Sequence, residues 1–173
     1  IDEGYDDWQL RFLAEVDSQY YRDITIRDYH RGSDISEGRI RKWAEEHGIE
    51  ENTTASLDVA LSDSRIVVNT VPQTTYLETL SADLPTLCFW NPQANLIRED
   101  LMPYFDGLVK AGVLHWTPES AARKLNEVAH DSVRWWNSYE VRIAVDEFRD
   151  NICHTAPNAI SEWALYIRER TFQ

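Results

Sequence analysis

Glycine is scarce in this sequence, and none of its glycines forms a nucleotide-binding loop. The six glycines stand at positions 4, 32, 38, 48, 107 and 112. Neither GxxxxGK[ST] nor GxGxxG can be built from that spacing, although both motifs need close glycines to bring the backbone near phosphates. The sequence therefore argues against phosphoryl transfer on a P-loop and against NAD binding of the Rossmann type.

Motifs for metal binding and nucleophilic catalysis are also missing. The five histidines, at positions 30, 47, 115, 130 and 154, show no HExxH or similar spacing, so we expect no metal site. A GxSxG elbow is absent. The two cysteines, Cys88 and Cys153, are far apart, and Cys88 lies in an apolar run where cysteine acts as a small hydrophobe. We expect both thiols to be reduced.

Basic residues are fewer than acidic ones, and no long apolar run occurs. The chain has 17 basic and 30 acidic residues, a net charge of −13. This balance argues against nucleic-acid binding and against an anionic membrane surface, although it allows a local basic pocket. We expect a cytoplasmic protein without a transmembrane segment, in which contact with the inner membrane could come only through parts outside this chain.

The most informative stretch runs from residue 66 to residue 90. A β-branched run at 66–68 is followed by a polar loop, a short helix with Leu77 and Leu80, and a second apolar run at 87–89. This order is typical of a βαβ unit. Because neither run alternates with polar residues, we expect a parallel sheet covered on both faces, with a ligand crevice at the carboxyl ends of its strands.

The loop at 69–75 should lie at this crevice. Thr74 and Thr75 begin the helix, so their hydroxyls and the free N–H groups of its first turn could bind an anion such as a phosphate. An alternative is a T-x-x-E capping box, in which Thr75 caps the helix and Glu78 folds back onto it. The two interpretations are compatible.

A second βα unit places cations near the same edge. The strand at 24–29 leads into a loop that holds Arg27, His30 and Arg31. In an acidic chain, three potential cations at the end of a strand point to an anion site. The alternative is a solvated loop whose arginines pair with Asp28 or Asp34.

The remaining pattern predicts one Rossmann-like α/β domain over residues 1–173. We expect neighbouring parallel strands at 24–29, 66–70, 86–90 and 113–116, with helices on both faces. The first helix is predicted at 6–22, and residues 52–65 show a weak strand or turn and a short helix. From Ser138 onward the pattern is wholly helical, which predicts an all-helical C-terminal tail.

The crevice would combine hydroxyls, amides and cations. Such groups bind phosphates and sugar hydroxyls, and among them only His30 and Glu78 could act as a general acid or base. No catalytic residue is assigned. The candidate binding residues are Arg27, His30, Arg31, Asn69, Thr70, Gln73, Thr74, Thr75, Glu78 and Asn91.

These residues resemble part of a known enzyme class. The strand, the hydroxyl-rich turn and the segment LETLSADLPTLCFW resemble the signature in the second half of bacterial GT-B glycosyltransferases. The longer segments NTVPQTTYLETLSADLPTLCFWNP, AGVLHWTPESAARKLNEV and WWNSYEVRIAVDEF are similar to the C-terminal part of a family of bacterial surface-carbohydrate transferases. The resemblance runs from about Ile24 to Phe148.

The resemblance implies that this chain is the donor-binding half of a longer glycosyltransferase. Thr74 and Thr75 would bind the phosphates of a nucleotide sugar, Glu78 the ribose or sugar hydroxyls, and the three cations at 27, 30 and 31 would complete the charge clamp. A preceding GT-B half would contact the glycan or glycoconjugate acceptor. The implied co-substrate is the nucleotide sugar, with no further cofactor.

One departure leaves the subclass open. Retaining families of the E-x7-E type would have an acidic residue at position 70, where this chain has Thr70. The turn at Thr74, Thr75 and Glu78 also resembles the Ser-Ser-x-x-x-Glu turn of enzymes that use CMP-sugars, with one residue fewer. CMP-, UDP- and GDP-sugars remain open, as do an inert sugar-nucleotide or protein-binding module of the same fold and an epimerase of the GT-B type.

Overall fold

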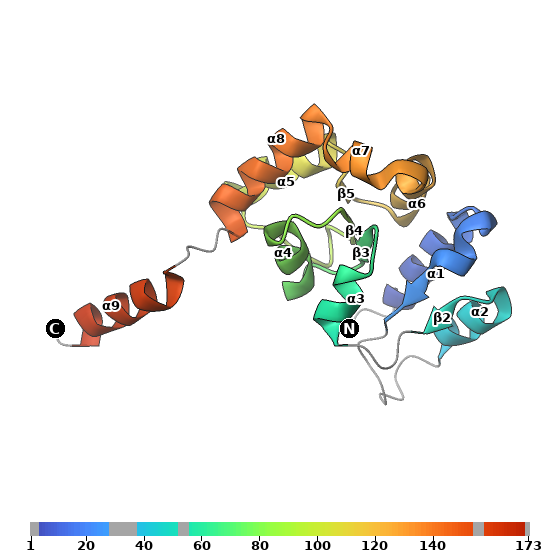
Figure 1. The fold of residues 1–173 in the computed structure, drawn as a ribbon, viewed down its shortest axis with the longest axis horizontal. Helices are drawn as coiled ribbons and strands as arrows, with labels where there is room; N and C mark the ends of the chain where they lie inside the picture. Colours follow the sequence, from blue (N-terminus) through green and yellow to red (C-terminus); the bar gives the residue numbers. More distant parts are fainter. Residues whose placement is uncertain (1–3, 28–37, 52–55, 154–157, 172–173) are drawn as a thin grey trace.

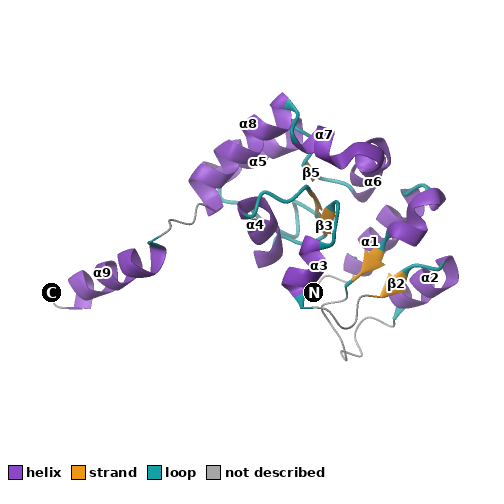
Figure 2. Cartoon of the chain, viewed as in Figure 1, coloured by secondary structure: helices purple, strands orange, loops and turns teal. Residues whose placement is uncertain are grey.

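The computed structural model describes residues 4–27, 38–51, 56–153 and 158–171, and within them it shows an α/β fold. Two small parallel sheets are flanked by helices, and the C-terminal region is helical (Figures 1 and 2). The predicted fold class is therefore confirmed.

A three-stranded sheet forms the centre of the molecule. Its strands are β3 (Val67–Asn69), β4 (Thr86–Phe89) and β5 (Leu114–His115), in the order β3-β4-β5. All pairs are parallel, and Asn69 lies opposite Cys88. Three of the four predicted neighbouring strands are thus confirmed, and their carboxyl ends share one edge.

The predicted strand at 24–29 is paired elsewhere. Among the described residues of this range, only Thr25–Ile26 (β1) forms a strand, and it pairs in parallel with β2 (Glu50–Glu51), a strand that was not predicted. The expectation that it neighbours the other three strands is wrong for the described residues, where the two sheets are separate. Two glutamates carry no strand pattern, so the β1 partner could not be read from the sequence.

Local sequence signals mark the ends of several helices. The first helix is shorter than expected because Val16 is extended, with φ −73° and ψ 135°, and a 3₁₀ turn follows at Ser18–Asp23. Gly48 ends its helix in the left-handed region, and the Thr117 hydroxyl caps another by accepting from the Ser120 N–H. The helices are α1 (Tyr5–Glu15), α2 (Arg39–His47), α3 (Leu57–Ser62), α4 (Thr74–Ser81), α5 (Met102–Lys110), α6 (Pro118–Val128), α7 (Ser132–Trp136), α8 (Tyr139–Phe148) and α9 (Ala159–Thr171).

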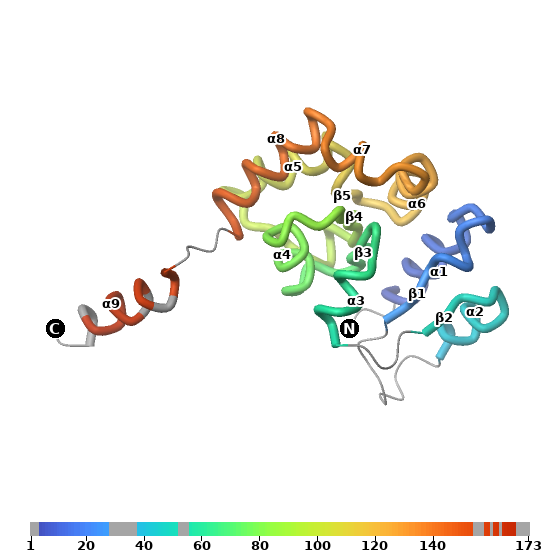
Figure 3. The backbone as a smooth tube through the Cα atoms, viewed as in Figure 1, coloured from blue at the N-terminus to red at the C-terminus, as the bar shows by residue number. Residues whose placement is uncertain are grey.

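Strand β4 joins two hydrophobic clusters. Its residues are all buried, and successive side chains point to opposite faces. Leu87 and Phe89 pack with α1 and α6, and the Phe89 ring stacks on Phe12 at 4.8 Å between centroids. Cys88, together with the following Trp90, packs with α5 and α8. The backbone in Figure 3 shows α5 and α8 side by side, across the sheet from α1.

The C-terminal helix α9 lies apart from the other elements in Figure 1. It carries the exposed apolar residues Leu165, Tyr166 and Ile167. Among the described helices, none is long and apolar enough to span a bilayer.

Candidate functional site

The candidate residues that follow β3 and β4 lie at the carboxyl edge of the central sheet. Asn69 ends β3 with only 7% of its surface exposed, and its Nδ2 donates to the Thr79 hydroxyl at 3.4 Å. Asn91 follows β4, and its Oδ1 accepts from the Gln93 N–H at 2.9 Å. Both amides thus hold local structure at this edge.

Thr70 is contacted by the first helix. Its hydroxyl oxygen lies 2.8 Å from the Tyr5 hydroxyl and accepts from the Gln9 side-chain amide at 3.3 Å. These two partners were not predicted, because nothing in the sequence indicates that α1 crosses the edge of the sheet. Thr70 therefore anchors α1 beside the loop.

Helix α4 begins at the loop without a side-chain cap. Thr74 is its first residue, Gln73 occupies the N-cap position, and no side chain accepts a hydrogen bond from the first turn. Thr75 lies inside the helix, so the alternative capping box with Glu78 is not formed. The physical reason is the helix start itself, since a capping residue must be extended and must precede the first turn.

The first turn of α4 therefore keeps its N–H groups available to a ligand. Thr74 and Gln73 are exposed and Thr75 is half-buried. Glu78 is also exposed, and its carboxylate has no hydrogen bond or ion pair with any residue that the structure describes. Unpaired N–H groups and the positive end of the helix dipole favour an anion at this position.

The predicted cation cluster is described only in part. Arg27 is exposed and directly follows β1. His30 and Arg31 lie outside the described residues, as does the whole loop at 28–37. Arg27 follows a strand of the smaller sheet. The pairing of β1 with β2 therefore separates Arg27 from the strand order on which the cation cluster was predicted.

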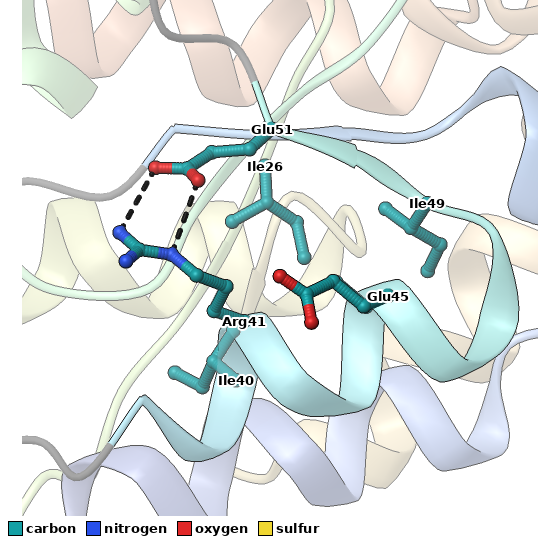
Figure 4. Close-up of a pocket in the computed structure, with 7 residues that line it drawn as sticks. Ile26, Ile40, Arg41, Glu45, Ile49 and Glu51 are labelled. Atoms are coloured by element: carbon teal, nitrogen blue, oxygen red, sulfur yellow. Dashed lines mark hydrogen bonds and ion pairs between the residues drawn. The ribbon is translucent and has the colours of Figure 1, made fainter.

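A pocket lies between α2 and the smaller sheet (Figure 4). Its apolar lining consists of Ile26, Ile40, Ala44 and Ile49, and its charged lining of Arg41, Glu45 and Glu51. Ile26 and Glu51 are the last residues of their strands, so the pocket opens at the carboxyl ends of a parallel pair. The pocket was not predicted from the sequence, because the strand that closes it consists of two glutamates and has no strand pattern.

Burial favours the neutral form of several ionisable side chains. Burial raises the pKa of the Cys88 thiol and raises the pKa of Tyr76 to about 12, so both stay protonated at neutral pH. Burial lowers the pKa of His115, whose ring nitrogens contact the Ser120 hydroxyl at 2.7 Å and the Gly112 carbonyl at 3.1 Å. Within the described residues, no three acidic, cysteine or histidine side chains form a metal-binding group.

Comparison with known proteins gives one informative result. Residues 3–167 match a family model described as "LIC12162 family transferase". No curated protein and no solved structure matches the chain.

Proposed function

Because this chain belongs to the LIC12162 family of transferases, we propose that it binds the nucleotide-sugar donor of a glycosyltransferase. The pathway would be the synthesis of bacterial surface polysaccharide or glycoconjugate. The observation that carries the proposal is the uncapped start of α4 at the carboxyl edge of the parallel sheet. A transferase of this kind must hold an anionic leaving group, and a free helix start in that place suits a diphosphate or phosphate.

The candidate residues on α4 then have roles that their positions allow. The N–H groups of the first turn and the Thr74 and Thr75 hydroxyls would bind phosphate oxygens. Glu78, one turn further along α4, would accept hydrogen bonds from ribose or sugar hydroxyls. Because the bound phosphates would interact with the positive end of the α4 dipole, affinity should rise as salt is lowered.

No acceptor site and no catalytic base are assigned among the described residues, since Glu78 is given a role in donor binding, and we therefore propose a donor-binding half. We expect the 173-residue chain to bind nucleotide sugars without transferring the sugar. Membership of a transferase family favours this function over an inert binding module. Sugar transfer by this chain alone would contradict the expectation that the acceptor site and the catalytic base lie outside it. It would not contradict the donor site.

Titration calorimetry of the Glu78→Gln variant tests the proposal. The amide can keep at most one of the hydrogen bonds that a carboxylate accepts from a diol, so affinity for the best nucleotide sugar should fall by about 1–3 kcal/mol. Thermal stability should not change, because Glu78 forms no cap. Glu140→Gln is the matched control, since Glu140 is an exposed glutamate on α8. Equal dissociation constants for wild type and Glu78→Gln would remove Glu78 from the site.

A further inference from the structure

The pocket beneath α2 breaks the usual pattern for a covered sheet. Ile26 and Glu51 are opposite each other in the β1–β2 register, so their side chains lie on the same face. Ile26 is apolar, as expected under a helix, but Glu51 places a carboxylate there with only 26% of its side chain exposed. Departures from the expected hydrophobic pattern tend to occur at functional sites.

Two of the three charged side chains that line this pocket pair with each other, and the third has no partner among the described residues. Arg41 binds both oxygens of Glu51, with Nε to Oε2 at 3.1 Å and Nη2 to Oε1 at 3.2 Å. Glu45 also faces the pocket from the next turn of α2, and its carboxylate has no partner among the described residues (Figure 4). One carboxylate is therefore left to accept hydrogen bonds, and the Arg41 Nη1 group can still donate.

The floor of the pocket suits a flat and largely apolar group. Ala44 and Ile49 are each 5% exposed, and Ile26 and Ile40 complete the aliphatic lining. An apolar surface with a few convergent polar groups is typical of small-molecule sites. A nucleobase combines an apolar face with an edge of donors and acceptors.

Contacts of α1 connect the pocket region with the loop before α4. Tyr5 contacts Thr70 of the loop before α4 at 2.8 Å. Two residues further along, Asp7 binds Arg39 at the start of α2 at 2.7 Å. Arg39 directly precedes Ile40 and Arg41 of the pocket. A single turn of α1 thus contacts both the loop before α4 and the residue that precedes the pocket lining on α2.

From these observations we infer that the pocket lined by Ile26, Ala44, Ile49 and Glu45 binds a nucleobase that carries an exocyclic amino group. This inference rests on the proposed function, because it assumes that the same nucleotide places its phosphates at α4. Guanine fits best, since its N1–H and N2–H groups can donate to both oxygens of Glu45 while O6 accepts from Arg41. Cytosine offers its N4 amino group, whereas uracil presents carbonyl oxygens on either side of its N3–H.

Nucleotides that differ by one amino group give a direct test. Calorimetry would compare GMP with IMP, which lacks the 2-amino group, and CMP with UMP. We expect GMP and CMP each to bind about tenfold more tightly than their partners, the effect of one charge-assisted hydrogen bond. Glu45→Gln should remove most of this preference. Glu46→Gln, on the adjacent exposed residue of the same helix, should keep it.

The outcomes separate this inference from the proposed function. Equal affinities within both pairs, or a preference that survives in Glu45→Gln, would overturn the base site. If Thr74→Val still weakens all four nucleotides in that case, the phosphate site stands alone. If no nucleotide binds, the base site and the proposed function both fail.

Discussion

His115 shows how the environment of one residue sets its protonation. Its Nε2 must carry the proton, because the Gly112 carbonyl can only accept, and its Nδ1 then accepts from the Ser120 hydroxyl. The residue is 8% exposed and lies near Lys124 and Arg123. A neutral imidazole thus ties β5 to the first turn of α6.

This arrangement predicts that stability depends on pH. Burial, aided by the two nearby cations, lowers the pKa of His115 in the folded state below the ordinary value of 6.5. The unfolded chain therefore takes up a proton as pH falls below about 6.5, while the folded chain resists it. The free energy of unfolding should fall from there until the folded pKa is reached.

Urea unfolding at pH 7.5 and pH 5.5 would measure this contribution. Wild type should lose more stability between the two values than His115→Gln, which has no ring to protonate. The lowered pKa values of Asp83 and Glu119 act at lower pH, below the ordinary carboxyl range. The same loss in both proteins would show that His115 does not contribute.

At the scale of elements, Asp83 joins the turn after α4 to helices α7 and α8. It is the one non-glycine residue with positive φ among those described, at 59°. Its Oδ1 accepts from the Trp136 indole at 3.0 Å and from Arg142. Partial burial opposes its ionisation, but these hydrogen bonds and the charge of Arg142 lower its pKa. An aspartate tolerates this backbone conformation better than most residues do.

Replacing Asp83 should separate backbone strain from lost contacts. Asp83→Ala removes the acceptor and leaves a Cβ in the left-handed region, which should cost about 1–2 kcal/mol or more in unfolding free energy. Asp83→Gly loses the same contacts without that strain, so it should be the more stable of the two. Urea denaturation gives both values.

Asp146→Ala is the matched control for the Asp83 variants. Asp146 also pairs with Arg142, at 2.8 Å, but its backbone is helical and its side chain is 52% exposed. Its loss should therefore cost about 0.5 kcal/mol or less. If Asp83→Ala is no less stable than Asp83→Gly, backbone strain at this turn is unimportant.

For the whole molecule, β4 makes the two hydrophobic clusters depend on each other. Leu87 belongs to the cluster with α1 and α6, and Leu108 to the cluster with α5 and α8, while β4 contributes side chains to both. Because the two clusters share this strand, loss of packing in one should weaken the other.

We therefore expect Leu87→Ala and Leu108→Ala each to cost about 2–5 kcal/mol, with one unfolding transition in both cases. Circular dichroism and tryptophan fluorescence should report the same midpoint. Leu96→Ala is the control, since Leu96 is 89% exposed and should matter little. Separate midpoints for the two signals would show that the clusters unfold independently.

The sequence by itself determined the central βαβ unit, the fold class and the ends of several helices. These features depend on local patterns: apolar runs at 66–68 and 87–89, Gly48 after a helix, and Thr117 before one. The start of α4 at Thr74 also followed from local residues. Such signals can be read from neighbouring positions, because backbone preference and side-chain periodicity act over a few residues.

Only the tertiary structure decided the partner of β1 and which distant side chains meet. The partner of β1 is a pair of glutamates, and the contact of Thr70 with Tyr5 joins residues 65 positions apart. The pocket beneath α2 depends on that pairing, since the register brings Glu51 beside Ile26. The pairing of β1 is set by packing between distant segments, and two adjacent glutamates give no local pattern from which it could be predicted.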